Sequence, residues 1–189
     1  KIRERGAAVQ WLYDSSKTAY TKSIMGEAKL RDRALLRLAK RVLFQPIADK
    51  IGENLECLIC GSAPLGEDTQ RWFEMIGIRV YQVYGLTETT AIVTMDQPPE
   101  VVPGRVGPAI SGCEVKLGEH NELLVRSDGI FNAYWNKPEA TDAAFVDGWF
   151  RTGDQAEVDP NGNWRIIGRV KNLIVPSSGH NVAPEPIEQ

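Results

Sequence analysis

The sequence predicts an α/β fold in which a β-α-β unit precedes a small antiparallel β subdomain. One observation is a mainly apolar run, residues 55–60, which a turn and an amphipathic segment separate from a second strand-like run, residues 78–84. Another is the change after Gln97-Pro98-Pro99, where short apolar segments alternate with turn residues. With 189 residues, 42% of them hydrophobic, the chain is long enough to bury a core.

Two helical segments are expected first, at residues 7–25 and from about residue 27. In the second segment apolar residues recur at helical spacing, at Leu30, Ala34, Leu35, Leu38 and Val42. The arginines between them should form the solvent-facing side: Arg31, Arg33, Arg37 and Arg41. Pro46 predicts a break, followed by a short helix that ends near Gly52.

The β-α-β unit begins with residues 55–60, which we expect to form a buried strand. A tight turn at residues 61–66 follows, and then a helix over residues 67–76 that Gly77 ends with a positive φ. The second strand, residues 78–84, should be the parallel neighbour of the first, because a right-handed crossover joins them. The turn and the loop after the second strand should therefore form two walls of one cleft.

The loop after the second strand, residues 85–90, is the first candidate site. Together with Tyr84 it offers hydroxyls, one carboxylate and an aromatic face. These groups suit a nucleotide and its metal, because hydroxyls bond phosphate oxygens, carboxylates bind magnesium and rings stack on bases. Ligands of open α/β sheets bind at such strand ends. A polar turn with a helix cap is the alternative.

The later part of the chain predicts two hairpins. Residues 114–117 and 122–126 flank one polar loop, and residues 156–158 and 163–167 flank Asp159-Pro160-Asn161-Gly162. Between these hairpins, Asp154 follows a glycine and could accept bonds from sugar hydroxyls, with an ordinary turn cap as the alternative. Arg169 has a planar fork that suits ribose and phosphate oxygens.

Charge and cysteine content limit the class of protein. The net charge is −3, but residues 1–50 hold 12 Lys and Arg against 5 Asp and Glu, which leaves +7 there and −10 in the remainder. Solvated helix faces explain the basic part, and contact with an anionic ligand or a membrane periphery is the alternative. Three cysteines favour a reducing compartment. Cys57 and Cys60 should point to opposite faces of a strand, which argues against a shared metal.

Nothing in the sequence resembles a membrane span or a signal peptide. No apolar run approaches the roughly 18 residues that cross a bilayer. We expect a soluble cytoplasmic protein with no nucleic-acid partner, and the sequence leaves its oligomeric state open. The first residue is not Met and the last residues form no cap, so we expect a piece of a longer protein.

Four motifs occur in an order that resembles the adenylate-forming superfamily. They are Gly61-Ser62-Ala63-Pro64-Leu65, Tyr84-Gly85-Leu86-Thr87-Glu88-Thr89, Trp149-Phe150-Arg151-Thr152-Gly153-Asp154 and Gly168-Arg169-Val170-Lys171-Asn172. The resemblance runs from about residue 55 to the end and is nearest to long-chain fatty-acid CoA ligases. It implies an enzyme that joins a fatty acid to ATP, with Mg²⁺, and then transfers the acyl group to CoA.

The resemblance also implies a role for each matching residue. Tyr84 would stack on adenine, while Gly61, Ser62, Ala63 and Pro64 line the adenine and acyl pockets, and Gly85 belongs to the same cofactor-binding set. The implied catalytic residues are Thr87, which contacts the α-phosphate and the acyl carbonyl, and Glu88, which holds magnesium.

Further along the chain, Asp154 and Arg169 would hold the ribose hydroxyls. Lys171 falls at the hinge of the superfamily, and Gly179 would border the channel for the pantetheine of CoA.

The resemblance implies a domain plan as well. Residues 1–97 would be the helical and α/β portion of the large N-terminal domain, residues 98–168 its β-rich subdomain, and residues 169–189 the hinge and a truncated C-terminal domain. Asn132-Ala133-Tyr134 departs from the usual Gly-Tyr, and Asn172 stands where an acidic residue is common. The phosphate loop and the catalytic Lys of the superfamily have no counterpart, so the chain alone should be inactive. A medium-chain or aryl acid ligase and a non-catalytic α/β module are the alternatives.

Overall fold

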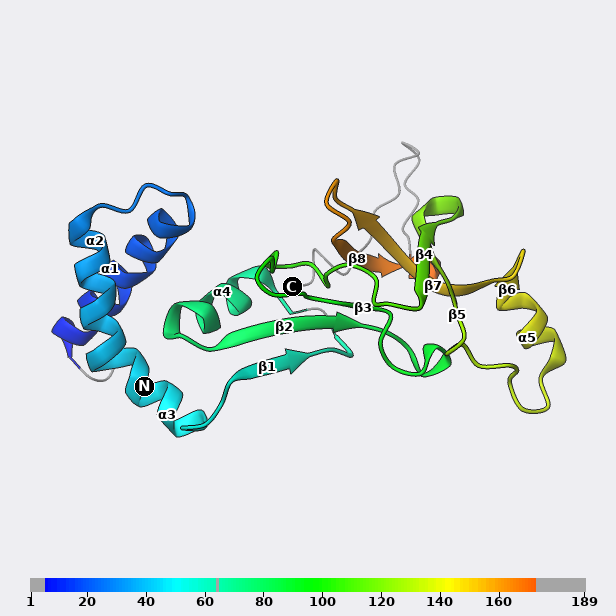
Figure 1. Ribbon diagram of the computed structural model, residues 1–189, viewed down its shortest axis with the longest axis horizontal. Helices are drawn as coiled ribbons and strands as arrows, with labels where there is room; N and C mark the ends of the chain where they lie inside the picture. The colour runs from blue at the N-terminus through cyan, green and yellow to red at the C-terminus, as the bar shows by residue number, and fades with distance from the viewer. Residues whose placement is uncertain (1–5, 64, 173–189) are drawn as a thin grey trace. The chain divides into compact units, whose positions relative to one another are not determined.

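The structure is a computed structural model that describes residues 6–63 and 65–172 (Figure 1). The chain forms two compact units: unit 1 comprises Lys1–Leu58 and Asp68–Val80, and unit 2 comprises Ile59–Glu67 and Tyr81–Gln189. Compact units within one chain need not coincide with the domains of a whole protein. The expected domain limits at residues 97 and 168 therefore stay predictions.

The helices begin and end close to the expected residues. They are α1 (Ala7–Ile24), α2 (Leu30–Ala39), the π-helix η2 (Lys40–Phe44), α3 (Gln45–Ile51) and α4 (Glu67–Ile76). The predicted break at Pro46 is wrong, because Pro46 lies in the first turn of α3 and η2 leads directly into that helix. Gly77 follows α4 with φ 94°, as predicted.

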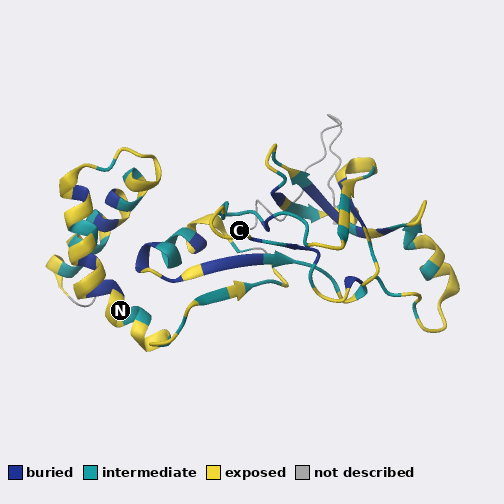
Figure 2. Cartoon of the chain, in the orientation of Figure 1, coloured by how far each residue is buried: buried dark blue, intermediate teal, exposed yellow. Residues whose placement is uncertain are grey.

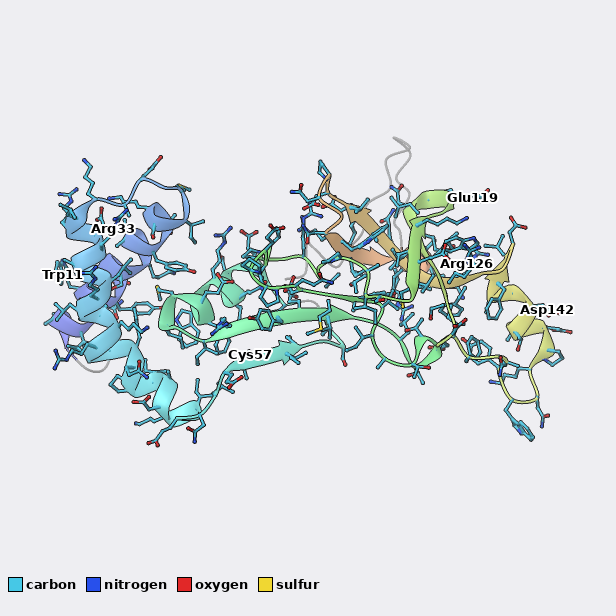
Figure 3. The ribbon with its side chains drawn as sticks, in the orientation of Figure 1. Trp11, Arg33, Cys57, Glu119, Arg126 and Asp142 are labelled. Carbon is cyan, nitrogen blue, oxygen red and sulfur yellow. The ribbon has the colours of Figure 1, made fainter. Side chains whose placement is uncertain are left out.

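The buried face of α2 and η2 is not the expected one. Leu30, Leu38 and Val42 are 85%, 52% and 59% exposed, whereas Leu43 and Phe44 are buried. The segment carries apolar residues on more than one side, and the π-helix turns the backbone more widely than an α-helix, so spacing alone selects no face. The four arginines are exposed, as predicted; Arg33 is labelled in Figure 3.

The core of unit 1 joins η2 to α4. Its buried members are Ala39, Leu43, Phe44, Met75, Ile76 and Ile78. Hydrogen bonds connect α1 to α4 beside this core, because the Trp72 indole donates to the Tyr13 hydroxyl at 3.0 Å and the Tyr20 hydroxyl donates to Glu74 at 3.0 Å.

A three-stranded sheet has the order β1 (Cys57–Cys60), β2 (Arg79–Tyr84), β3 (Thr94–Met95). The arrows of β1 and β2 point the same way in Figure 1, which confirms the predicted parallel neighbours, and β3 pairs with β2 in antiparallel fashion. The prediction of a buried first strand is wrong. β1 lies at the edge of the sheet and Ile59 is 60% exposed, whereas much of β2 is buried (Figure 2).

The second sheet is antiparallel, as expected, with β7 near its centre. Its strands are β4 (Cys113–Leu117), β5 (Glu122–Ser127), β6 (Phe145–Val146), β7 (Trp149–Val158) and β8 (Trp164–Arg169), in the order β4-β5-β7-β6 with β8 also pairing to β7. Both predicted hairpins are present: Val115 faces Val125, and Glu157 faces Arg165. The sequence did not reveal that β7 starts at Trp149, nor the short helix α5 (Pro138–Ala143).

The antiparallel sheet contributes most of the core of unit 2. Leu123, Ala156 and Trp164 are buried together with Val106 from the preceding loop. A separate aromatic cluster joins Phe131, Phe145 and Phe150, whose ring centroids are 5.6–5.8 Å apart. Among the described helices, none combines the length and the apolar character needed to cross a membrane.

Candidate functional site

A cavity of about 240 Å³ lies within unit 2, and segments distant in sequence line it. One wall is the turn after β1, another is the end of β2 with the loop that follows, and a third is formed by β7 and β8. The lining residues are Ser62, Ala63, Leu65, Gln82, Val83, Tyr84, Gly85, Leu86, Gly104, Val106, Asp154, Ile166, Gly168 and Arg169.

The turn after β1 is fixed against the end of β2 by two contacts. The backbone N–H of Leu65 donates to Gln82 Oε1 at 3.1 Å. At Gly61 a Cβ would come within 2.7 Å of Val83 Cγ2, so a larger residue would push the turn away. Gly61 therefore acts as a spacer, while Ser62 and Ala63 reach the cavity wall.

Three side chains meet at the polar end of the cavity. The Tyr84 hydroxyl donates to Asp154 Oδ2 at 2.6 Å, and Arg169 Nε lies 3.0 Å from Asp154 Oδ1. Asp154 and Arg169 are direct partners across β7 and β8, which explains their proximity. Burial raises the pKa of Tyr84 above its ordinary value, and the negative charge of Asp154 raises it further. Tyr84 is therefore a neutral hydrogen-bond donor at neutral pH.

Backbone and side-chain bonds hold Asp154 in place. The backbone N–H of Asp154 donates to Thr152 Oγ1 at 3.1 Å, and that hydroxyl donates to the Leu123 carbonyl at 2.8 Å. The buried carboxylate of Glu122 accepts from the backbone N–H of Gly153 at 3.0 Å and from Arg151 at 2.9 Å. Sequence reasoning missed Glu122, because its partners lie about 30 residues away along the chain.

The loop after β2 folds back on itself. Thr87–Thr89 form a 3-10 turn, in which the Leu86 backbone N–H donates to Thr89 Oγ1 at 2.9 Å. A Cβ on Gly85 would overlap the carbonyl of Ala91, so only glycine permits this path. Thr89 is thus the capping residue of the turn, as the alternative for this loop proposed.

The two expected catalytic residues lie beside the cavity, not in its wall. Thr87 is exposed, and its hydroxyl has no hydrogen-bond partner within the described ranges. Glu88 is partly exposed, and its Oε1 accepts a bond from the Tyr134 hydroxyl at 2.8 Å. Sequence reasoning noted Asn132-Ala133-Tyr134 only as a departure from the usual Gly-Tyr, because nothing near residue 134 indicates a partner 46 positions earlier.

Of three other expected site residues, the structure describes only Lys171, which is not part of the cavity lining. Lys171 is exposed in a 3-10 turn (Val170–Asn172) that follows β8. Pro64 and Gly179 lie outside the described residues.

Cys57, Cys60 and Cys113 are free thiols. No group of three or more His, Cys, Asp or Glu side chains in the described part of the chain could hold a metal.

The arrangement is suited to a ligand with an aromatic part and vicinal hydroxyls. Apolar side chains, among them Val106 and Ile166, line the same cavity as the ring of Tyr84. The Asp154 carboxylate can accept hydrogen bonds from sugar hydroxyls, and the Arg169 guanidinium can donate hydrogen bonds to sugar oxygens. A mostly apolar pocket with a few placed polar groups is typical of small-molecule sites.

Comparison with protein families and curated proteins identifies relatives. A model described as AMP-binding enzyme matches residues 14–135. The chain is 36% identical over 156 residues to the long-chain-fatty-acid–CoA ligase FadD15 of Mycobacterium bovis, which covers 82% of this chain and 26% of that protein. It is 36% identical over 167 residues to long chain acyl-CoA synthetase 1 of Arabidopsis thaliana, covering 80% of this chain and 25% of that one. The chain thus spans about a quarter of these relatives.

Solved structures show the same local architecture. The O-succinylbenzoate Coenzyme A synthetase of Bacillus subtilis, in complex with ATP and magnesium ion, superposes with a TM-score of 0.65 and 25% identity over 76% of this chain and 34% of that one. An ATP-bound protein of Rhodopseudomonas palustris, MatB, gives a TM-score of 0.62 and 38% identity over 69% of this chain and 28% of the other.

Proposed function

The chain belongs to the AMP-binding enzyme family, and from this membership we propose that it is part of an ATP-dependent fatty-acid CoA ligase. In the first step a carboxylate oxygen attacks the α-phosphorus of ATP, the bond to the β-phosphate breaks, and acyl-AMP and pyrophosphate form. In the second step the thiol of CoA attacks the acyl carbon, loses its proton and displaces AMP. The described residues would belong to the large N-terminal domain, with Lys171 at its hinge.

One observation carries the proposal: Tyr84, Asp154 and Arg169 meet in a cavity that the turn after β1 also lines. In this assignment the ring of Tyr84 stacks on adenine, and Ser62 and Ala63 border the base and the acyl group. The carboxylate of Asp154 accepts bonds from the ribose hydroxyls, and Arg169 donates to them.

Glu88 fits the magnesium ion that ATP brings. Its Oε1 accepts from Tyr134, and no hydrogen bond or ion pair is made to Oε2 by the described residues. Magnesium usually takes one or two protein carboxylates and completes its shell with water and phosphate oxygens, so a single carboxylate is sufficient. When bound, the ion would offset negative charge on the phosphates. Thr87, one residue earlier and exposed, would bind the α-phosphate and the acyl carbonyl.

The names of the curated relatives support a long-chain fatty acid as the acid substrate. A second candidate is an aryl acid, because solved relatives include an anthranilate CoA ligase, 26% identical with a TM-score of 0.64, and the O-succinylbenzoate enzyme. We place the enzyme in the cytoplasm. Exposed leucines beside arginines on α2 favour peripheral membrane contact.

Titration calorimetry of AMP into this chain tests the proposal. We expect weak binding in the wild type and a loss of roughly tenfold or more in Asp154→Ala, because a charge-assisted hydrogen bond to ribose is removed. Asp142→Ala on α5 is the matched control, since Asp142 is exposed and distant from the cavity lining (Figure 3).

Equal AMP affinity in the wild type and in Asp154→Ala would contradict the nucleotide site. Binding that is absent from the wild type would favour the remaining alternative, a non-catalytic α/β module.

A further inference from the structure

We infer that Tyr134 is a positioning residue for Glu88, whose carboxylate it orients toward a divalent cation bound with ATP. The inference rests on the proposed function, because it needs Glu88 to be a metal ligand. Tyr134 does not line the cavity, and the proposed function gives it no role.

The loop over residues 127–135 makes three hydrogen bonds with residues 88–90. The Thr90 hydroxyl donates to the Gly129 carbonyl, and the Phe131 backbone N–H donates to the Glu88 carbonyl at 2.9 Å. The Tyr134 hydroxyl donates to Glu88 Oε1 at 2.8 Å. One loop therefore fixes both the backbone and the side chain of Glu88.

Tyr134 is itself held firmly. Its backbone N–H donates to Thr141 Oγ1 on α5 at 3.0 Å, and its carbonyl accepts from the Lys137 N–H at 3.2 Å. Its ring lies 4.6 Å from that of Phe131, which packs in turn on Phe145 and Phe150. The hydroxyl is thus presented from a fixed aromatic cluster, so it can set the position of a carboxylate on another loop.

The two carboxylate oxygens of Glu88 differ in their contacts. Tyr134 uses Oε1, and in the part of the chain that the structure describes nothing bonds to Oε2. A glutamate has several rotatable bonds, and a donor on one oxygen restricts them and directs the other oxygen. Residues that orient a ligand in this way commonly change metal affinity by about ten- to a hundredfold when they are removed.

The experiment adds this chain to preformed Mn²⁺–ATP and follows the further change in the Mn²⁺ paramagnetic resonance signal that the protein causes, because ATP alone already binds the metal. We expect Tyr134→Phe to weaken Mn²⁺ binding by about tenfold and Glu88→Gln to remove it. The double variant should lose no more than Glu88→Gln, because both changes act through one carboxylate. Tyr20→Phe is the matched control, since the Tyr20 hydroxyl donates to Glu74 at 3.0 Å in unit 1.

AMP affinity, measured without metal, separates this inference from the proposed function. If the wild type binds AMP but Tyr134→Phe leaves Mn²⁺ binding unchanged, the positioning role is refuted and the nucleotide site stands. The same holds if the wild type binds AMP but no Mn²⁺. A parallel loss of AMP and Mn²⁺ binding in Tyr134→Phe would mean a structural role only. A wild type that binds neither ligand would refute the proposed function and this inference with it.

Discussion

At the scale of single residues, hydrogen bonds hold the side chains of the candidate site in place before any ligand binds. Asp154 is bonded through one oxygen to Tyr84 and through the other to Arg169. Glu122 serves Asp154 indirectly, because it holds the neighbouring Gly153 backbone. Such preorganisation reduces the conformational freedom that a ligand must remove on binding.

Gly85 provides a prediction at this scale. Gly85→Ala should lower the free energy of unfolding by at least about 3 kcal/mol, because a Cβ would overlap the carbonyl of Ala91. Gly66→Ala is the control, since a Cβ there meets no atom within 4 Å. Urea denaturation of both variants measures the difference. Equal stability would show that the loop after β2 takes another path.

At the scale of elements, the helical hairpin of unit 1 shows the limit of periodicity. The sequence located α1, α2 and α4 well, because capping and spacing are local. Periodicity alone selected the wrong face of α2, since Leu30 and Leu38 satisfy a helical pattern as well as the buried Ala39 does. Packing against α4 decided between the two faces.

Paired substitutions in α2 and η2 test this assignment. Phe44→Ala should lower the free energy of unfolding by about 3–5 kcal/mol, because Phe44 is only 1% exposed in the core of unit 1. Leu30→Ala should change it by less than about 0.5 kcal/mol, because that side chain already faces solvent. Thermal or urea unfolding measures both. If Leu30→Ala lowered the free energy of unfolding more than Phe44→Ala, the buried face would be the one that periodicity selects.

At the scale of the whole molecule, the proposed reaction needs more groups than those assigned among the described residues. In the proposed function the cavity binds the base and the ribose, and within the described residues only Glu88 is assigned to the metal. Phosphate transfer depends on several positive groups that stabilise charge on the leaving pyrophosphate. The chain spans about a quarter of its curated relatives.

ATP–pyrophosphate exchange tests the proposal at this scale. The 189-residue chain alone should show no exchange, whereas the chain extended by the matching segments of a curated relative should show exchange that depends on a fatty acid. In the extended protein Glu88→Gln should lower the rate by about a hundredfold, because bound metal contributes several kcal/mol to such reactions. Glu119→Gln, at an exposed hairpin position, is the control. Unchanged exchange in Glu88→Gln would remove Glu88 from the metal site.

The sequence alone determined what depends on neighbours along the chain. The helix over residues 67–76, its end at Gly77 and both hairpins were predictable, because capping, turn chemistry and strand alternation act over a few residues.

Only the tertiary structure decided which side chains meet. It placed Tyr84 on Asp154 across 70 positions, and Tyr134 on Glu88 across 46. It also buried Leu43 in place of Leu38. The reason is physical: such contacts arise when separate elements pack, and packing depends on the shapes and the registers of both partners. The spacing of residues along the chain specifies neither those shapes nor those registers.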